Sequence, residues 1–161
     1  MTLGYIGLGS NLGESIATIK AAELHIADLP GIELLKRSSL YRTAPQGVLD
    51  QPDFINAVVE VQATAAPEDL LPRLKAIEVE LGRKPSIPWG PRVIDLDLLI
   101  YGDVYLSTPE LTIPHAEMWV RLFVLAPLAE LRPDLHDPSG RPILDVCDSL
   151  RDSQRVERLE V

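Results

Sequence analysis

The chain has 161 residues and a formal net charge of −9, from 15 basic and 24 acidic side chains. This length is typical of one domain, and the acidic balance argues against a general nucleic-acid surface, which needs a basic stripe. Apolar runs are too short to span a membrane, and Cys147 has no second cysteine for a disulfide. We expect one domain over residues 1–161 in a reducing, cytoplasmic compartment. We expect no nucleic-acid, membrane or obligate protein partner, and we interpret Cys147 as a small buried hydrophobe.

The first half of the chain alternates between predicted strands and helices. In chain order these elements are a strand over residues 3–8, a helix ending near residue 29, a strand over 32–41, a loop over 42–52 and a strand over 53–63. At the start of the helix, Asn11 and Glu14 have the spacing of a capping box. The run Gly7–Gly13 resembles a dinucleotide fingerprint, but its third glycine falls one residue late. We therefore interpret that run as a strand-to-helix turn.

Strand 53–63 has two different faces, because successive side chains of a strand alternate. One face carries an unbroken apolar set, formed by Ile55, Ala57, Val59, Val61 and Ala63. The opposite face carries Phe54, Asn56, Val58 and Glu60. We expect helices to cover the apolar face and to leave the second face for a ligand.

The second half continues with a helix over 67–81, a loop over 83–91, a strand over 93–101, a helix over 118–131 and a short helix over 142–150. Pro72 predicts that the first of these helices starts late or bends, and Gly102–Asp103 predicts a two-residue hairpin. The order strand-helix-strand-strand-helix-strand is typical of the ferredoxin-like fold. We therefore expect an α+β fold with a βαββαβ core, a mainly antiparallel sheet, helices on its apolar face and a C-terminal helical extension.

The run 89–99 carries a pair of aspartates on the strand over 93–101. Asp95 and Asp97 share one face of that strand, and the other face carries Ile94, Leu96, Leu98 and Ile100. Two carboxylates about 5 Å apart repel by roughly 3 kcal/mol at an effective dielectric near 20, so the pair indicates a cation between them. Mg²⁺ suits this arrangement, since it takes one or two carboxylates and fills its octahedron with water and phosphate oxygens. An Asp-x-Asp alone is more often solvated on a sheet edge, but the preceding Arg92 adds a phosphate donor and favours the metal.

Three linked motifs, in order along the chain, resemble the 6-hydroxymethyl-7,8-dihydropterin pyrophosphokinase family. They are Tyr41–Gly47 with Gln51–Asn56, Trp89–Arg92 with Asp95–Asp97, and Pro114–His115. The resemblance implies transfer of the pyrophosphoryl group of ATP to the hydroxymethyl group of the pterin, leaving AMP, in folate biosynthesis. It also implies a ferredoxin-like fold, two Mg²⁺ ions, and ATP and the pterin as small-molecule partners.

The resemblance also implies roles for individual residues. Those expected to act in catalysis are Arg83, Arg92, Asp95 and Asp97, and the two aspartates would be the metal ligands. Those expected to bind ATP are Glu78, Arg83, Arg92, Thr112, His115 and Arg121. Those expected to bind the pterin are Thr43, Ala44, Pro45, Gln46, Phe54, Asn56, Trp89 and Phe123. The positions that depart from residues common in the family are Lys75, Pro88, Glu110 and Ala116, which bears on affinity for the adenine side.

Two of these roles agree with the alternation along strand 53–63. A flat polar heterocycle needs an aromatic face for stacking and an amide for its edge, and Phe54 and Asn56 lie together on the face away from the core. His115 taken alone is equally consistent with a phosphate donor and a structural histidine. The rival hypothesis is a ferredoxin-like regulatory module that binds a small molecule without catalysis. Loop 83–91 has Ile87 and Trp89 as its only long apolar side chains, so we expect a lid that orders over both substrates.

Overall fold

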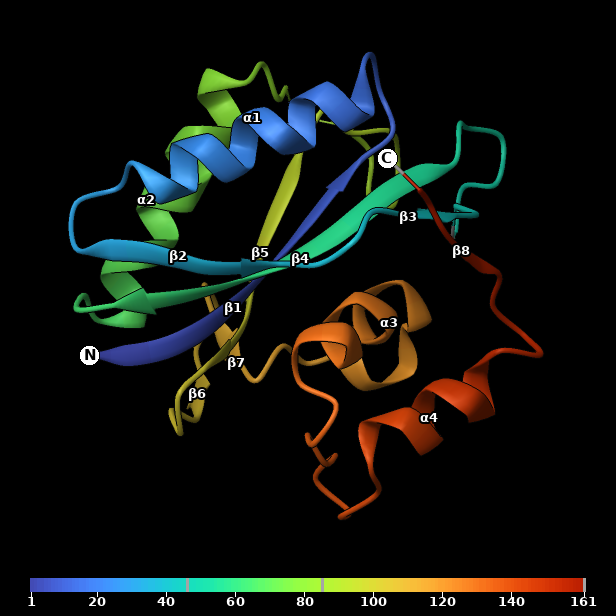
Figure 1. The fold of residues 1–161 in the computed structure, drawn as a ribbon. Coiled ribbons are helices and arrows are strands. Elements are labelled where there is room, and N and C mark those ends of the chain that lie inside the picture. The colour runs from blue at the N-terminus through green and yellow to red at the C-terminus, as the bar shows by residue number, and fades with distance from the viewer. Residues whose placement is uncertain (46, 85, 161) are drawn as a thin grey trace.

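The computed structural model describes residues 1–45, 47–84 and 86–160. Six strands of this part of the chain form one sheet: β1 (Thr2–Ser10), β2 (Ile32–Arg37), β3 (Tyr41–Thr43), β4 (Phe54–Ala63), β5 (Asp95–Tyr101) and β8 (Val156–Arg158). The strand order is β5-β1-β4-β3-β8, and β2 pairs with the second half of β4 (Figure 1). Every pairing is antiparallel. The fold is therefore of the α+β class, as predicted.

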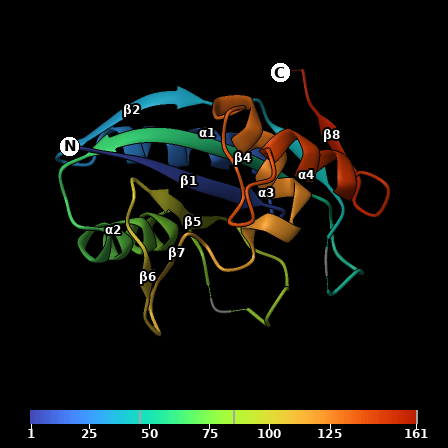
Figure 2. The ribbon, with the colours of Figure 1, turned by 90° about the horizontal axis from the view of Figure 1, so that it is seen from below.

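Helices lie on both faces of this sheet. One face is covered by α1 (Ser15–Ala27) and α2 (Pro67–Glu80). The other face carries α3 (Leu122–Leu131), and α4 (Ile143–Leu150) packs on α3 (Figure 1 and Figure 2). The expectation that helices cover only the apolar face is wrong, because the second face has its own apolar cluster in which Tyr5, Val58 and Leu99 pack against α3 and α4. None of the described helices is long and apolar enough to cross a membrane.

The alternation along β4 is confirmed. Every second side chain from Ile55 to Ala63 is buried in the core shared with α1 and α2. On β5, Leu96 and Leu98 join the same core as predicted, but Ile100 belongs to the cluster on the opposite face. The register between β1 and β5 shifts next to Tyr5, and such a bulge moves the following side chains to the other face.

The predicted capping box at the start of α1 is wrong. Glu14 is the N-cap residue, and no side chain caps this helix. The Asn11 side chain is engaged elsewhere: its Nδ2 donates to the carbonyl of Pro52 at 2.9 Å, and its Oδ1 accepts from the backbone N–H of Arg92 at 2.8 Å. Tertiary contacts therefore replace the local cap.

The predicted strand over 32–41 is divided into β2 and β3. Ser38 lies between them and binds Val58 of β4 through both its backbone N–H and its hydroxyl, each at 2.9 Å. The predicted hairpin after β5 is also wrong. A turn does form at Gly102–Asp103, but the next strand, β6 (Leu106–Ser107), pairs with β7 (Thr112–Ile113) instead of β5.

Two further helix predictions need correction. α2 begins at Pro67, a position where the missing N–H of proline costs no helical hydrogen bond. The predicted later start is therefore wrong, although Pro72 does lie inside the helix. The helix predicted over 118–131 is divided into a 3-10 helix, η1 (Met118–Val120), and α3, because Arg121 is extended with φ −119° and ψ 103°. Cys147 is buried in α4, as expected.

Candidate active site

A cavity of about 270 Å³ lies between the second face of the sheet, the start of α3 and the loop before β5. Its wall includes most of the residues singled out from sequence: Thr43, Ala44, Phe54, Asn56, Trp89, Arg92, Asp95, Asp97, His115, Arg121 and Phe123. The wall also includes Pro88, one of the departures from the family, and further lining residues that the sequence did not suggest include Gly7, Gly9, Leu99 and Val124. The structure therefore brings side chains from distant motifs to one hollow.

Two glycines of β1 form the floor of the cavity. Gly7 pairs with Asp97 and Gly9 with Asp95 on one side, and Gly9 pairs with Asn56 on the other. A Cβ on Gly9 would lie only 2.8 Å from Asn56 Oδ1, so a side chain there would displace that amide. Gly7 lies in the strand predicted over residues 3–8, and β1 continues through Gly9 to Ser10, so the predicted strand-to-helix turn occupies only the end of the glycine run. The sequence signal that could have identified them is the alternation along β1, which puts Gly7 and Gly9 on the face opposite the core residues Ile6 and Leu8.

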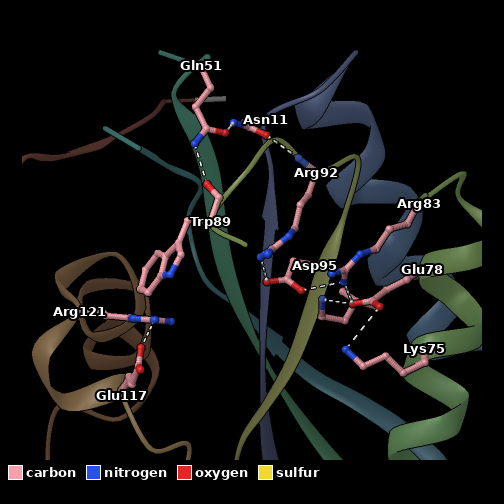
Figure 3. A network of polar contacts seen from close by, with 11 residues as sticks. Asn11, Gln51, Lys75, Glu78, Arg83, Trp89, Arg92, Asp95, Glu117 and Arg121 are labelled. Carbon is pink, nitrogen blue, oxygen red and sulfur yellow. Dashed lines mark hydrogen bonds and ion pairs between the residues drawn. The ribbon is translucent and has the colours of Figure 1, made fainter. Parts of the chain in front are cut away.

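Asp97 and Asp95 differ in how their charges are compensated. Burial, and then the neighbouring Asp95 carboxylate, raise the pKa of Asp97 from 3.8 to about 7. Asp95 is paired with two arginines: Arg83 Nη1 lies 2.9 Å from Oδ1, and Arg92 Nη1 lies 3.6 Å from Oδ2 (Figure 3). The floor therefore holds two half-buried carboxylates: Asp95, which is paired with two arginines, and Asp97, which has no arginine partner among the described residues.

Glu78 is buried behind this pair and does not line the cavity. Its Oε2 accepts a hydrogen bond from the backbone N–H of Leu96 at 2.7 Å and lies 2.9 Å from Arg83 Nη1. Its Oε1 lies 3.4 Å from Lys75 Nζ (Figure 3). Glu78 thus ties α2 to β5 and orients Arg83 toward Asp95.

The opposite end of the cavity carries the predicted pterin residues. Phe54 and Asn56 reach it from β4, and Phe123 reaches it from the first turn of α3. Asn56 Nδ2 donates to Thr43 Oγ1 of β3 at 2.8 Å, which fixes the amide plane. An aromatic face and an oriented amide are therefore available at one place.

Arg121 connects the two ends of the site. Its guanidinium lies over the Trp89 ring, 4.9 Å from the centroid, and 5.7 Å from the centroid of Phe123. It is also paired with Glu117 (Figure 3). Burial, and then the charge of Arg121, lower the pKa of His115, which favours a neutral imidazole in the cavity wall.

Asn11 and Gln51 join the loops around the cavity, and sequence reasoning gave neither of them this role. Asn11 Nδ2 donates to Gln51 Oε1 at 2.9 Å, and Gln51 Nε2 donates to the carbonyl of Trp89 at 2.8 Å (Figure 3). Trp89 has a left-handed backbone with φ 64°, which is unusual for a bulky residue and marks a constrained position. The Trp89 loop therefore has fixed contacts in this structure, while its closure over substrates stays a prediction.

Five predicted residues do not line the main cavity or cannot be placed. Glu78 is one, and Arg83 is the second, since it reaches the site only through its contact with Asp95. Thr112 is in β7, paired with Ser107. Pro45 lines a second hollow of about 110 Å³, next to Phe123 and the residues just before β8. Gln46 lies outside the described residues.

The chain is similar to known proteins over most of its length. Residues 5–133 match the family model described as 7,8-dihydro-6-hydroxymethylpterin-pyrophosphokinase (HPPK). A 2-amino-4-hydroxy-6-hydroxymethyldihydropteridine pyrophosphokinase of Pseudomonas aeruginosa is 47% identical over 137 residues, covering 85% of each chain. An enzyme with the same name from Methylorubrum extorquens is 42% identical over 160 residues, covering 99% of this chain and all of its own.

The fold is also found in solved structures. Plasmodium falciparum HPPK-DHPS, wild type with SDX-DHP, has a TM-score of 0.72 at 15% identity, covering 100% of this chain and 48% of that one. A second HPPK-DHPS structure, in complex with substrates, has a TM-score of 0.71 at 14% identity. The chain thus spans less than half of these larger chains, and the likeness shows the fold. From the family match and the two curated relatives, the chain belongs to the 7,8-dihydro-6-hydroxymethylpterin-pyrophosphokinase family.

Proposed function

We propose that the cavity on the second face of the sheet is where this chain performs the reaction of its family. That reaction transfers a pyrophosphoryl group from ATP to 6-hydroxymethyl-7,8-dihydropterin in folate biosynthesis. The observation that carries this assignment is the carboxylate pair Asp95 and Asp97, on the same cavity wall as Phe54 and Asn56. Phosphate chemistry and heterocycle binding are thereby supported within one hollow.

The pterin is proposed to bind at the β4 end of the cavity. Its ring would stack between Phe54 and Phe123, and its edge would bond to the Asn56 amide, which Thr43 already orients at 2.8 Å. Glycine at position 9 supports this assignment, because a side chain there would meet Asn56 Oδ1. Trp89, Ala44, Pro45 and Gln46 are proposed to complete the pocket.

Two Mg²⁺ ions are proposed to bind at Asp95 and Asp97. Among the described residues, no group of three or more histidine, cysteine or acidic side chains is placed to hold a metal, so the protein alone does not form a full cage. A pair of carboxylates fits Mg²⁺, which takes its remaining ligands from water and phosphates. The raised pKa of Asp97 also fits, because a half-buried carboxylate beside another one is stabilised by a cation. When bound, Mg²⁺ supplies charge neutralisation for the phosphates and activation of the attacking oxygen.

The arginines are proposed to bind the nucleotide phosphates. Arg83 and Arg92 converge on Asp95, and Arg121 enters the cavity from the other side. Bidentate guanidinium groups match phosphate oxygens, so these residues would hold the triphosphate in line with the pterin hydroxyl and neutralise charge on the departing AMP. His115 is proposed to donate to a phosphate. Glu78 and Thr112 are proposed to contribute from the nucleotide side.

The mechanism relies on positioning and electrostatics. The hydroxymethyl oxygen attacks the β-phosphorus, and its proton passes to solvent. The bond between the β-phosphorus and the oxygen bridging to the α-phosphate breaks, and AMP leaves with that oxygen. Holding both reactants in line and neutralising the developing charge together account for most of the rate enhancement in phosphoryl transfer. We also propose a ferredoxin-like classification for residues 1–161 as one domain, which the order β5-β1-β4 followed by β2 and β3 supports.

The direct test is product identification. The protein is incubated with Mg²⁺, ATP and 6-hydroxymethyl-7,8-dihydropterin, with a matched sample in excess EDTA, and nucleotides are separated by chromatography. We expect AMP and the pterin diphosphate in equal amounts, and none with EDTA. Formation of ADP would contradict pyrophosphoryl transfer. Binding of both ligands without turnover would instead favour a non-catalytic binding module.

A further inference from the structure

The backbone break before α3 exposes two polar groups beside a site residue. Arg121 is extended, so the helical hydrogen bonds of η1 do not continue into α3. The N–H of Leu122 and the carbonyl of Val120 lie on the two sides of this break. Groups at helix ends need partners from outside the helix, and α3 has no side-chain cap from its own N-cap residue.

A glutamine from the C-terminal segment satisfies both groups. The Leu122 N–H donates to Gln154 Oε1 at 2.8 Å, and Gln154 Nε2 donates to the Val120 carbonyl at 2.8 Å. A primary amide carries a donor and an acceptor in one plane, so one side chain can bridge the peptide groups on both sides of Arg121.

Gln154 is itself held on both sides. Its backbone N–H donates to the carbonyl of Leu150 at the end of α4, at 3.0 Å. Two residues later, Val156 begins β8 and pairs with Thr43 of β3. The segment therefore joins α4 to the strand that orients Asn56, and it lies beyond the residues 5–133 that match the family model.

We propose that Gln154 is a positioning residue for the reaction, acting through Arg121. By fixing the peptide groups on either side, it sets the direction of the Arg121 side chain, whose guanidinium lies 4.9 Å from the centroid of Trp89. It also sets the start of α3 and thereby Phe123. This inference rests on the proposed function, in which Arg121 contacts nucleotide phosphates.

The test is a double-mutant cycle between Gln154→Ala and Arg121→Ala. Calorimetry with a non-hydrolysable ATP analogue and Mg²⁺ gives the dissociation constant, and steady-state assays give kcat and the KM for ATP. We expect Gln154→Ala to raise the analogue's dissociation constant at least fivefold in the parent. In the Arg121→Ala background we expect less than a twofold change, because the residue through which Gln154 acts is gone.

Two more variants separate positioning from packing and local charge. Gln154→Met keeps the size of the side chain but removes both hydrogen bonds, so it should behave like Gln154→Ala. Asp152→Asn changes an exposed neighbour and should leave binding within twofold of the parent. Thermal melting of each variant shows that the protein measured is folded.

A spectroscopic signature gives a second readout. In a Trp119→Phe background the chain has a single tryptophan, Trp89, so its fluorescence reports on the stacked guanidinium. Gln154→Ala should shift the emission in the same direction as Arg121→Ala. An unchanged spectrum and an unchanged dissociation constant, with only a lower melting temperature, would make Gln154 a purely structural residue and overturn the proposal. If Arg121→Ala itself leaves analogue binding unchanged, the assignment of Arg121 in the proposed function is the part that fails.

Discussion

The two faces of the central sheet use the same strands for different purposes. On the face under α1 and α2, the side chains of Ile6 and Leu96 are fully buried in an aliphatic core. One residue further along, Gly7 and Asp97 pair with each other on the opposite face and line the cavity. Because side chains alternate along a strand, stability and chemistry fall on consecutive residues. The buried side chains under α1 and α2 therefore fix the strands whose opposite face carries the glycines and charged residues of the cavity.

This contrast has an energetic side. Burying an aliphatic side chain stabilises the fold by roughly 1.5–3 kcal/mol, whereas burying an unpaired carboxylate costs free energy. The raised pKa of Asp97 is a sign of that cost. The core face is built for stability, and the cavity face keeps groups that reduce stability but suit a cation and phosphates.

The largest expected effect is on turnover at the cavity face. Asp97→Asn removes a charge proposed to hold Mg²⁺ and should lower kcat at least a thousandfold, about 4 kcal/mol. AMP formation by the folded variant measures the loss. Turnover within tenfold of the parent would show that the metal does not depend on this carboxylate.

A neighbouring change on the core face should have the opposite profile. Ile6→Ala leaves a cavity under α1 and α2 and should lower the free energy of unfolding by about 3 kcal/mol, measured by urea denaturation. The kcat of the folded protein should stay within threefold of the parent, because Ile6 points away from the site. A large loss of kcat without a loss of stability would contradict the assignment of stability to one face and chemistry to the other.

The contrast can be sharpened at the pterin end. Phe54→Ala should weaken pterin binding by roughly 1–3 kcal/mol, as removal of a stacking ring does. Binding of a non-hydrolysable ATP analogue should hardly change. Calorimetry with each ligand makes the comparison. An equal loss of binding free energy for both ligands would show that Phe54 supports folding and does not contact the pterin.

The last expected effect is a pH dependence of stability in metal-free buffer. The pKa of Asp97 is about 7 in the folded chain against 3.8 as the ordinary value, so between these pH values the unfolded chain loses a proton that the folded chain keeps. Stability should therefore fall as pH rises through this window and remain lower above it. Asp97→Asn removes this titrating group. The melting temperature of the variant minus that of the parent should therefore be larger at pH 8 than at pH 5. A difference that is the same at both pH values would contradict the shift.

Patterns that repeat along the chain predicted much of the fold and the site. The alternation in strand 53–63 identified the core face and the face of Phe54 and Asn56, since both follow from the geometry of one strand. The aspartates were found because two charges on one face of an apolar strand need a partner. The resemblance then supplied residues from other segments, and the structure brings most of them to one cavity.

The remaining features depend on contacts between distant segments. Asn11 has the spacing of a helix cap, but the structure uses its amide to join Pro52 and Arg92. At the division of the helix over 118–131, the freed peptide groups bond to Gln154, 33 residues beyond Arg121 along the chain. Strand β8 is three residues long and is specified by pairing with β3. Local periodicity carries no information on any of these.

The ion pairs of Asp95 have a consequence for how affinity should respond to ionic strength. Arg83 and Arg92 already neutralise this carboxylate without any substrate. In the proposed complex these guanidinium groups would bind phosphate and so exchange one anionic partner for another. Much of the free energy cost of removing them from water would then already have been incurred during folding. Added salt screens the old pairs as well as the new ones. Nucleotide affinity should therefore fall less steeply with salt concentration than two free surface arginines would produce.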